Sequence, residues 1–197
     1  MRRDDLPELH YIATIANLAS IRQHGILSHK QASRVQHTSV AMREMQERRE
    51  KVVVPGARPL HEYVNLYICA RNKMLFKIKG KHAELCVLRI STDVLELPGV
   101  VVTDQNASSK YVRFAPVDAG LSRLDSDLVF AEYWTHSDDP IQEWRHGSIK
   151  CAEVLIPDRA DPRFIQGGYV SCEASRSTVE SAAQGFPVTI DGHLFFR

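Results

Sequence analysis

The sequence predicts a single α+β domain over residues 1–197. The first 50 residues have mainly helical spacing, and most of the remaining chain alternates in the manner of short strands. No repeat, low-complexity tract or linker-like stretch divides the chain. A chain of 197 residues can bury a full hydrophobic core but is short for two domains. Helices followed by a run of strands are typical of an α+β fold.

The first predicted helices lie near the N-terminus. Asn17 is a suitable N-cap for a helix over residues 18–24, and Gly25 would end that helix. A second helix is expected after Ser39 and should continue to about Lys51, before a break at Pro55-Gly56. Two further helices are expected within residues 121–134 and over residues 140–146.

The apolar runs after Pro59 predict strands, because they are short and are flanked by turn-forming residues. The candidates are residues 63–69, 74–79, 84–90, 100–103, 111–115, 151–156 and 169–172, with a last strand or hairpin over residues 188–196. We expect these strands to form the centre of the domain, with the N-terminal helices beside them.

Composition and charge limit the classes of function. The formal net charge is +1, from 25 basic and 24 acidic side chains, so phosphate binding would need a local basic patch. The four cysteines form no C-x-x-C pair and are expected to be reduced thiols, mostly buried. No apolar run is long enough to span a bilayer or serve as a signal peptide. We therefore expect a cytoplasmic protein without a membrane partner.

Common catalytic motifs are absent from the sequence. It contains no G-x-G-x-x-G, no G-x-x-x-x-G-K-[ST] and no G-x-S-x-G, so dinucleotide, P-loop and hydrolase sites of those kinds have no support. His61-Glu62 begins like the zinc motif H-E-x-x-H, but Asn65 stands where the second histidine should be. No metal site is expected, and an active site would have to combine residues from separate segments.

Four segments carry a family resemblance: residues 9–28, 45–53, 58–76 and 151–158. The first ends in H-G-I-L-S, the second contains an arginine pair, and the fourth contains a glutamate within an apolar run. Taken in this order they resemble the DarT family of bacterial DNA ADP-ribosyltransferase toxins. The resemblance covers about residues 9–170 and implies an ADP-ribosyltransferase-like fold, with central β-sheets flanked by N-terminal helices.

The resemblance implies transfer of ADP-ribose from NAD, as co-substrate, to a nucleobase of single-stranded DNA. It further implies a toxin whose antitoxin removes ADP-ribose from DNA. Glu153 matches the family's catalytic glutamate. Such a carboxylate suits the reaction, because the bond between nicotinamide and ribose breaks through a positively charged, oxocarbenium-like sugar. Alternation alone leaves a second interpretation open, in which Glu153 faces solvent from a strand.

The remaining expected catalytic residues are Arg48 and Arg49, one of which matches the family's active-site arginine. A guanidinium can bind the pyrophosphate of NAD bidentately, although a solvated helix face is the alternative. The opening segment is expected to bind nicotinamide, and aromatic or thioether side chains to surround the cofactor. The expected cofactor-binding residues are His10, Tyr11, Ile12, Asn17, Gly25, Tyr63, Tyr67 and Met74. A structural histidine is the alternative for His10, and an ordinary core position is the alternative for Tyr63, Tyr67 and Met74.

A basic stretch interleaved with Tyr67 and Phe76 is the candidate nucleic-acid surface, because proteins that bind single strands combine positive charge with stacking aromatics. Its candidate contacts are Arg71, Lys73, Lys77 and Lys79. The alternative is that these lysines solvate one face of a strand. Two other functions also stay open: the same fold acting on RNA or protein, and an inactive nucleic-acid-binding module.

Overall fold

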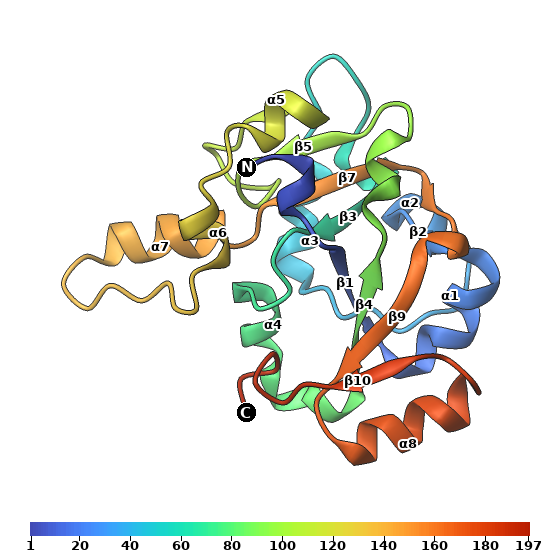
Figure 1. The fold of residues 1–197 in the computed structure, drawn as a ribbon. Coiled ribbons are helices and arrows are strands. Elements are labelled where there is room, and N and C mark those ends of the chain that lie inside the picture. The colour runs from blue at the N-terminus through green and yellow to red at the C-terminus, as the bar shows by residue number, and fades with distance from the viewer.

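The computed structural model describes residues 1–197 and centres on an eight-stranded sheet (Figure 1). Its strands are β1 (Leu9–Thr14), β3 (Tyr63–Tyr67), β4 (Leu85–Ile90), β5 (Val101–Thr103), β6 (Phe114–Pro116), β7 (Glu153–Pro157), β9 (Ile165–Val170) and β10 (Val188–Ile190). Their order is β10-β9-β4-β1-β3-β7-β5-β6, and only the β10–β9 pair is parallel. Two short strands, β2 (Ile26–Leu27) and β8 (Arg159–Ala160), pair separately. The predicted α+β class is confirmed.

The helices surround this sheet and are short. They are α1 (Leu18–His24), α2 (His29–Ala32), α3 (Arg43–Glu50), α4 (Lys73–Lys77), α5 (Val117–Leu121), α6 (Ser126–Phe130), α7 (Pro140–Ile149) and α8 (Glu173–Ala182). In Figure 1 α8 lies below β9 and β10, while α6 and α7 project to one side. No helix has the length and apolar character needed to cross a membrane.

One predicted strand is wrong. Residues 74–79 do not form a strand, because α4 covers Lys73–Lys77. Asn72 explains the difference, since its side chain is fully buried and its Oδ1 accepts hydrogen bonds from the backbone N–H groups of Met74 (2.9 Å) and Leu75 (3.0 Å). This N-cap fixes a helical start where a short apolar run alone did not distinguish helix from strand.

Other predicted boundaries shift by a few residues. Helix α1 has the predicted bounds and ends at Gly25, but the side chain of Asn17 makes no capping hydrogen bond. Helix α6 lies within residues 121–134 as predicted but has only five residues, and α5 ends where that region begins. The last strand ends at Ile190 instead of extending through residue 196. All four cysteines are free, and three of them are buried.

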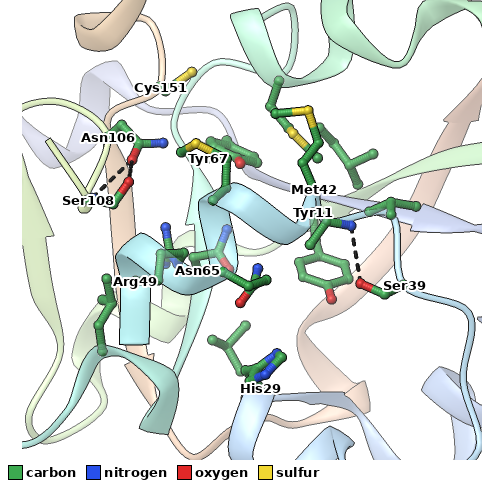
Figure 2. Close-up of a pocket in the computed structure, with 18 of the residues that line it drawn as sticks. Tyr11, His29, Ser39, Met42, Arg49, Asn65, Tyr67, Asn106, Ser108 and Cys151 are labelled. Carbon is green, nitrogen blue, oxygen red and sulfur yellow. Dashed lines mark hydrogen bonds between the residues drawn. The ribbon is translucent and has the colours of Figure 1, made fainter. Parts of the chain in front are cut away.

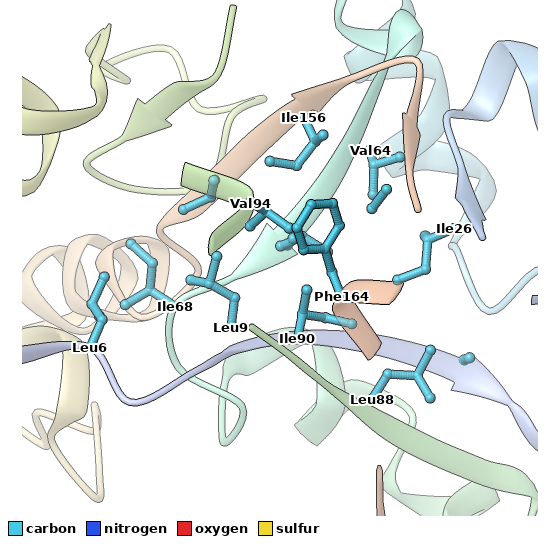
Figure 3. Packing of buried hydrophobic residues seen from close by; sticks show 14 of the residues in the cluster. Leu6, Leu9, Ile26, Val64, Ile68, Leu88, Ile90, Val94, Ile156 and Phe164 are labelled. Atoms are coloured by element: carbon cyan, nitrogen blue, oxygen red, sulfur yellow. The ribbon is translucent and has the colours of Figure 1, made fainter. Parts of the chain in front are cut away.

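The main core covers one face of the sheet. It contains 29 buried residues, including Leu9, Val64 and Ile156, which lie on strands β1, β3 and β7 (Figure 3). Successive strand residues point to opposite faces, so the neighbours Tyr63, Tyr67 and Leu155 belong to smaller clusters on the other side. Ile12, Tyr63 and Tyr67, which belong to these smaller clusters, also line the pocket described next.

Candidate active site

A pocket of about 320 Å³ opens beside β3 and α3. Side chains from β1, α3 and β3, among them Tyr11, Arg49 and Tyr67, converge on it (Figure 2). Its wall also includes residues from the segment that precedes α3, from α4, from the loop between β5 and β6, and from α7. The pocket therefore joins segments that are far apart in the sequence, as expected for a site that no contiguous motif describes.

The wall of this pocket is strongly biased in charge. It includes the cationic side chains Arg48, Arg49, Lys73 and Lys77 and no aspartate or glutamate. The chain as a whole is nearly neutral, at +1. Concentrating positive charge in a concave site raises the local concentration of anionic ligands, because low-dielectric walls focus the field. The pocket thus suits a ligand that carries phosphates.

Glu153 lies just behind the pocket wall, at the start of β7. Its carboxylate accepts two hydrogen bonds from the guanidinium of Arg49, Nη1 to Oε1 and Nη2 to Oε2, both at 3.0 Å. The backbone N–H of Ala107 donates a third to Oε1 at 3.2 Å. The side chain of Glu153 is 0% exposed and that of Arg49 is 8% exposed. A charged pair this deeply buried persists only with such complete hydrogen bonding.

The sheet holds Glu153 in place through its two neighbouring strands. Glu153 is paired with Tyr67 on β3 and with Thr103 on β5. Its backbone N–H donates to the Oγ1 atom of Thr103 at 3.1 Å. Burial, followed by the nearby charge of Glu153, raises the pKa of the Tyr67 hydroxyl well above its usual value. Tyr67 is therefore a neutral neighbour of the carboxylate. Because the side chain of Glu153 is fully buried, the interpretation in which it faces solvent is wrong.

The two candidate arginines occupy different positions on α3. Arg49 is buried and faces Glu153, whereas Arg48 is exposed at the pocket wall. Burial opposes the charge of Arg49, but the Glu153 carboxylate outweighs burial, so the net effect raises the Arg49 pKa. Arg49 is thus a permanent cation in direct contact with the candidate catalytic carboxylate.

Comparisons with known proteins agree with this geometry. The family model described as "ssDNA thymidine ADP-ribosyltransferase, DarT" matches residues 10–196. The chain belongs to the DarT family. A DNA ADP-ribosyl transferase of Thermus aquaticus is 30% identical over 192 residues, which cover 91% of this chain and 82% of that protein.

Two further relatives extend the DarT comparison. A DNA ADP-ribosyl transferase–DNA ADP-ribosyl glycohydrolase fusion protein of Thermosipho africanus is 29% identical over 199 residues, 96% of this chain and 49% of that protein. This chain therefore spans about half the length of the fusion protein. The structure of Thermus sp. 2.9 DarT in complex with carba-NAD+ superposes with a TM-score of 0.78 at 25% identity, covering 96% of this chain and 98% of that one.

Most of the expected cofactor residues of this DarT chain meet at the pocket. Those that line it are Tyr11, Ile12, Asn17, Tyr63, Tyr67 and Met74. The Asn17 side chain also holds the segment before α3 in place. It donates to the backbone carbonyl of Thr38 (2.8 Å) and accepts from the Thr38 N–H (3.0 Å). This explains why Asn17 does not cap α1.

His10 and Gly25 lie away from the pocket. The His10 ring is buried near Glu8 and Tyr169, and burial lowers its pKa to about 4. Gly25 has φ +78°, and a Cβ there would lie 2.2 Å from the carbonyl oxygen of Ala160. Gly25 therefore lets the chain turn from α1 into β2 beside β8, which is a structural role.

The expected nucleic-acid residues divide in the same way. Lys73 and Lys77 line the pocket. Arg71 instead donates to the backbone carbonyls of Glu132 (2.7 Å) and His193 (3.1 Å), and its guanidinium lies 4.1 Å from the ring centre of Phe196. The ammonium of Lys79 lies 4.1 Å from the ring centre of Phe76. Arg71 and Lys79 thus lie outside the pocket wall.

Sequence reasoning missed several polar groups of the pocket. The rings of His29 and His61 lie 4.2 Å apart between centroids, and burial is the largest cause that lowers the pKa of each. Three buried atoms of the lining residues, Nε2 of His61, Oε1 of Gln46 and Oγ1 of Thr14, have no hydrogen-bond partner. Buried polar atoms without partners are rare, so these three are available to a ligand. The only sequence signal was the incomplete H-E-x-x-H motif at His61.

Proposed function

We propose that this chain transfers ADP-ribose from NAD to the thymine of a nucleotide in single-stranded DNA. The observation that carries this proposal is the Arg49–Glu153 pair behind a pocket wall that contains only cationic charged side chains. The family model's description supports thymidine as the acceptor, and the carba-NAD+ complex of a relative supports NAD as the donor.

Arg49 is proposed to bind the diphosphate of NAD. The guanidinium of Arg49 neutralises the carboxylate of Glu153. A bound diphosphate offers the same guanidinium a second anion, which suits its bidentate geometry. Sharing Arg49 in this way releases a carboxylate oxygen of Glu153 toward the ribose. Lys73 and Lys77 supply further positive charge along the wall, and Tyr11 and Tyr67 supply ring surface.

Glu153 is proposed to act on the ribose and on the acceptor base. The bond between ribose C1′ and the nicotinamide nitrogen breaks, and nicotinamide leaves with the bonding electron pair. The carboxylate stabilises the positive charge that develops on the sugar. The N3 atom of thymine, which carries the only ring N–H of thymidine, forms the new bond to C1′, and its proton passes to Glu153.

The biological role is proposed from the fusion relative. That protein joins a DNA ADP-ribosyl transferase to a DNA ADP-ribosyl glycohydrolase. We infer that the present chain is a toxin opposed by a glycohydrolase that removes its modification from DNA. The reaction is assigned to the cytoplasm, where NAD and chromosomal DNA are both available.

Labelled NAD and a panel of acceptors test this function. The panel contains four acceptors: a DNA oligonucleotide with thymines, the same oligonucleotide with every thymine replaced by cytosine, an RNA of the same sequence, and a protein mixture. We expect label only on the first acceptor, with mass spectrometry locating the adduct on thymine. Label confined to RNA or protein would overturn the acceptor assignment. Binding of DNA without any transfer would indicate an inactive binding module.

A further inference from the structure

Two exposed aromatic side chains meet at the rim of the pocket. The Trp144 side chain belongs to α7 and lines the pocket, although 49% of the residue is exposed. Tyr111 is 72% exposed, and its ring lies edge-to-face with the Trp144 ring at 6.3 Å between centroids. An isolated exposed aromatic needs no explanation, but a pair at the mouth of a charged pocket marks a binding surface.

Trp144 is held by a well-anchored helix. Asp139 caps α7, because its Oδ1 accepts hydrogen bonds from the N–H groups of Ile141 (3.0 Å) and Gln142 (2.9 Å). Farther along, Gly147 packs so closely on α4 that an added Cβ would lie 2.8 Å from the Lys73 side chain. The helix ends next to Lys150, which is fully buried and donates to the carbonyl of Val129 at 3.1 Å. The indole is therefore presented from a fixed position.

Tyr111 belongs to the loop that also contacts the candidate catalytic carboxylate. The loop runs from β5 to β6, and its Ala107 N–H donates to Glu153. The backbone N–H of Arg113 donates to the carboxylate of Asp104 at 2.9 Å, which closes the loop. Lys110 and Arg113, on either side of Tyr111, are both exposed. The rim thus combines aromatic surface with positive charge, and it is continuous with the pocket.

We propose that Tyr111 and Trp144 form a stacking clamp for the base next to the target thymine in single-stranded DNA. This inference rests on the proposed function. A target base must leave its stack before it can enter the pocket, and its neighbour then loses a stacking partner. An aromatic ring at the pocket rim replaces that partner for any base, while Lys110 and Arg113 attract the backbone phosphates.

Steady-state kinetics test the clamp by separating its effect on DNA from its effect on NAD. Trp144→Ala and Tyr111→Ala are each expected to raise KM for the oligonucleotide roughly tenfold, the value typical for loss of one stacked base. KM for NAD should stay within about twofold in Tyr111→Ala, because Tyr111 lies outside the pocket wall. Trp144→Phe should retain most of the affinity because it keeps a ring. Ile141→Ala is the matched control, since Ile141 is exposed on the same helix and lies outside the pocket wall.

Fluorescence gives an independent measurement. The chain has two tryptophans, of which Trp134 is buried. A thymine oligonucleotide should quench the emission of the wild-type protein, and the quenching should disappear in Trp144→Phe. Two results would overturn the clamp while wild-type transfer to DNA continued. One is an unchanged oligonucleotide KM in Trp144→Ala, and the other is a rise in KM for NAD in Tyr111→Ala that equals the rise in its oligonucleotide KM. Absence of wild-type transfer to DNA would overturn the proposed function instead.

Discussion

Replacing Arg49 by methionine removes one partner of the buried ion pair and leaves the other in place. The carboxylate of Glu153 is fully buried and would keep only the Ala107 N–H of its three hydrogen bonds. Breaking one side of a buried ion pair typically costs about 3–5 kcal/mol, because an uncompensated charge stays behind. We expect Arg49→Met to lower the free energy of unfolding by about that amount.

The double variant Arg49→Met/Glu153→Gln isolates the charge. Glutamine keeps the shape of the side chain and an oxygen that accepts from Ala107, but it carries no charge. We expect the double variant to recover about 2 kcal/mol or more of the loss, since no buried charge remains without a partner. If the two substitutions acted independently, the double variant would have a lower free energy of unfolding than Arg49→Met, whereas we expect a higher one.

Urea denaturation measures both effects. With a slope of ~2 kcal/mol per molar urea, a loss of 3–5 kcal/mol moves the midpoint by about 1.5–2.5 M. Arg48→Met is the matched control, because Arg48 is the exposed neighbour on the same helix, and it should stay within about 0.5 kcal/mol of the wild type. A loss below about 1 kcal/mol in Arg49→Met, or a double variant no more stable than Arg49→Met, would refute the buried-pair argument.

Three other predictions follow from residues outside the ion pair. Gly25→Ala should destabilise the fold by about 2 kcal/mol or more in the same urea assay, because φ is +78° and the new Cβ would meet the Ala160 carbonyl. The His10 ring should titrate with a pKa of about 4 by NMR. Because this pKa is lower in the folded than in the unfolded protein, the free energy of unfolding should be highest above pH ~6.5 and should fall by up to about 3 kcal/mol as the pH drops toward 4. Cys172 should be the first thiol alkylated by iodoacetamide at neutral pH, because hydrogen bonds from Ser175 and Ser171 lower its pKa to about 7, and equal labelling of the three buried cysteines would contradict this.

The strands and α1 were predictable because their signals are local. Alternating apolar residues located most of the strands, and Gly25 marked the end of α1. The strand predicted over residues 74–79 failed for a local reason too, namely the cap formed by Asn72. A five-residue helix has too few residues for its periodicity to differ from that of a short strand.

The site was only partly predictable because its contacts are distant in sequence. Arg49 and Glu153 are separated by 104 positions, and only the family resemblance brought them together before the structure did. No local pattern shows that β3 pairs with β7, or that α7 places Trp144 at the pocket. Charge runs were equally ambiguous: Lys73 and Lys77 face the pocket, while Arg71 and Lys79 contact aromatic rings elsewhere.

The most direct measurement of the central claim is single-turnover transfer from NAD to a thymine oligonucleotide by Glu153→Gln, with saturating NAD. Loss of the carboxylate charge should lower the rate about 10²–10⁴-fold, while circular dichroism shows an intact fold and NAD still binds. A folded Glu153→Gln protein that transfers ADP-ribose within a few-fold of the wild-type rate would show that the reacting carboxylate lies elsewhere.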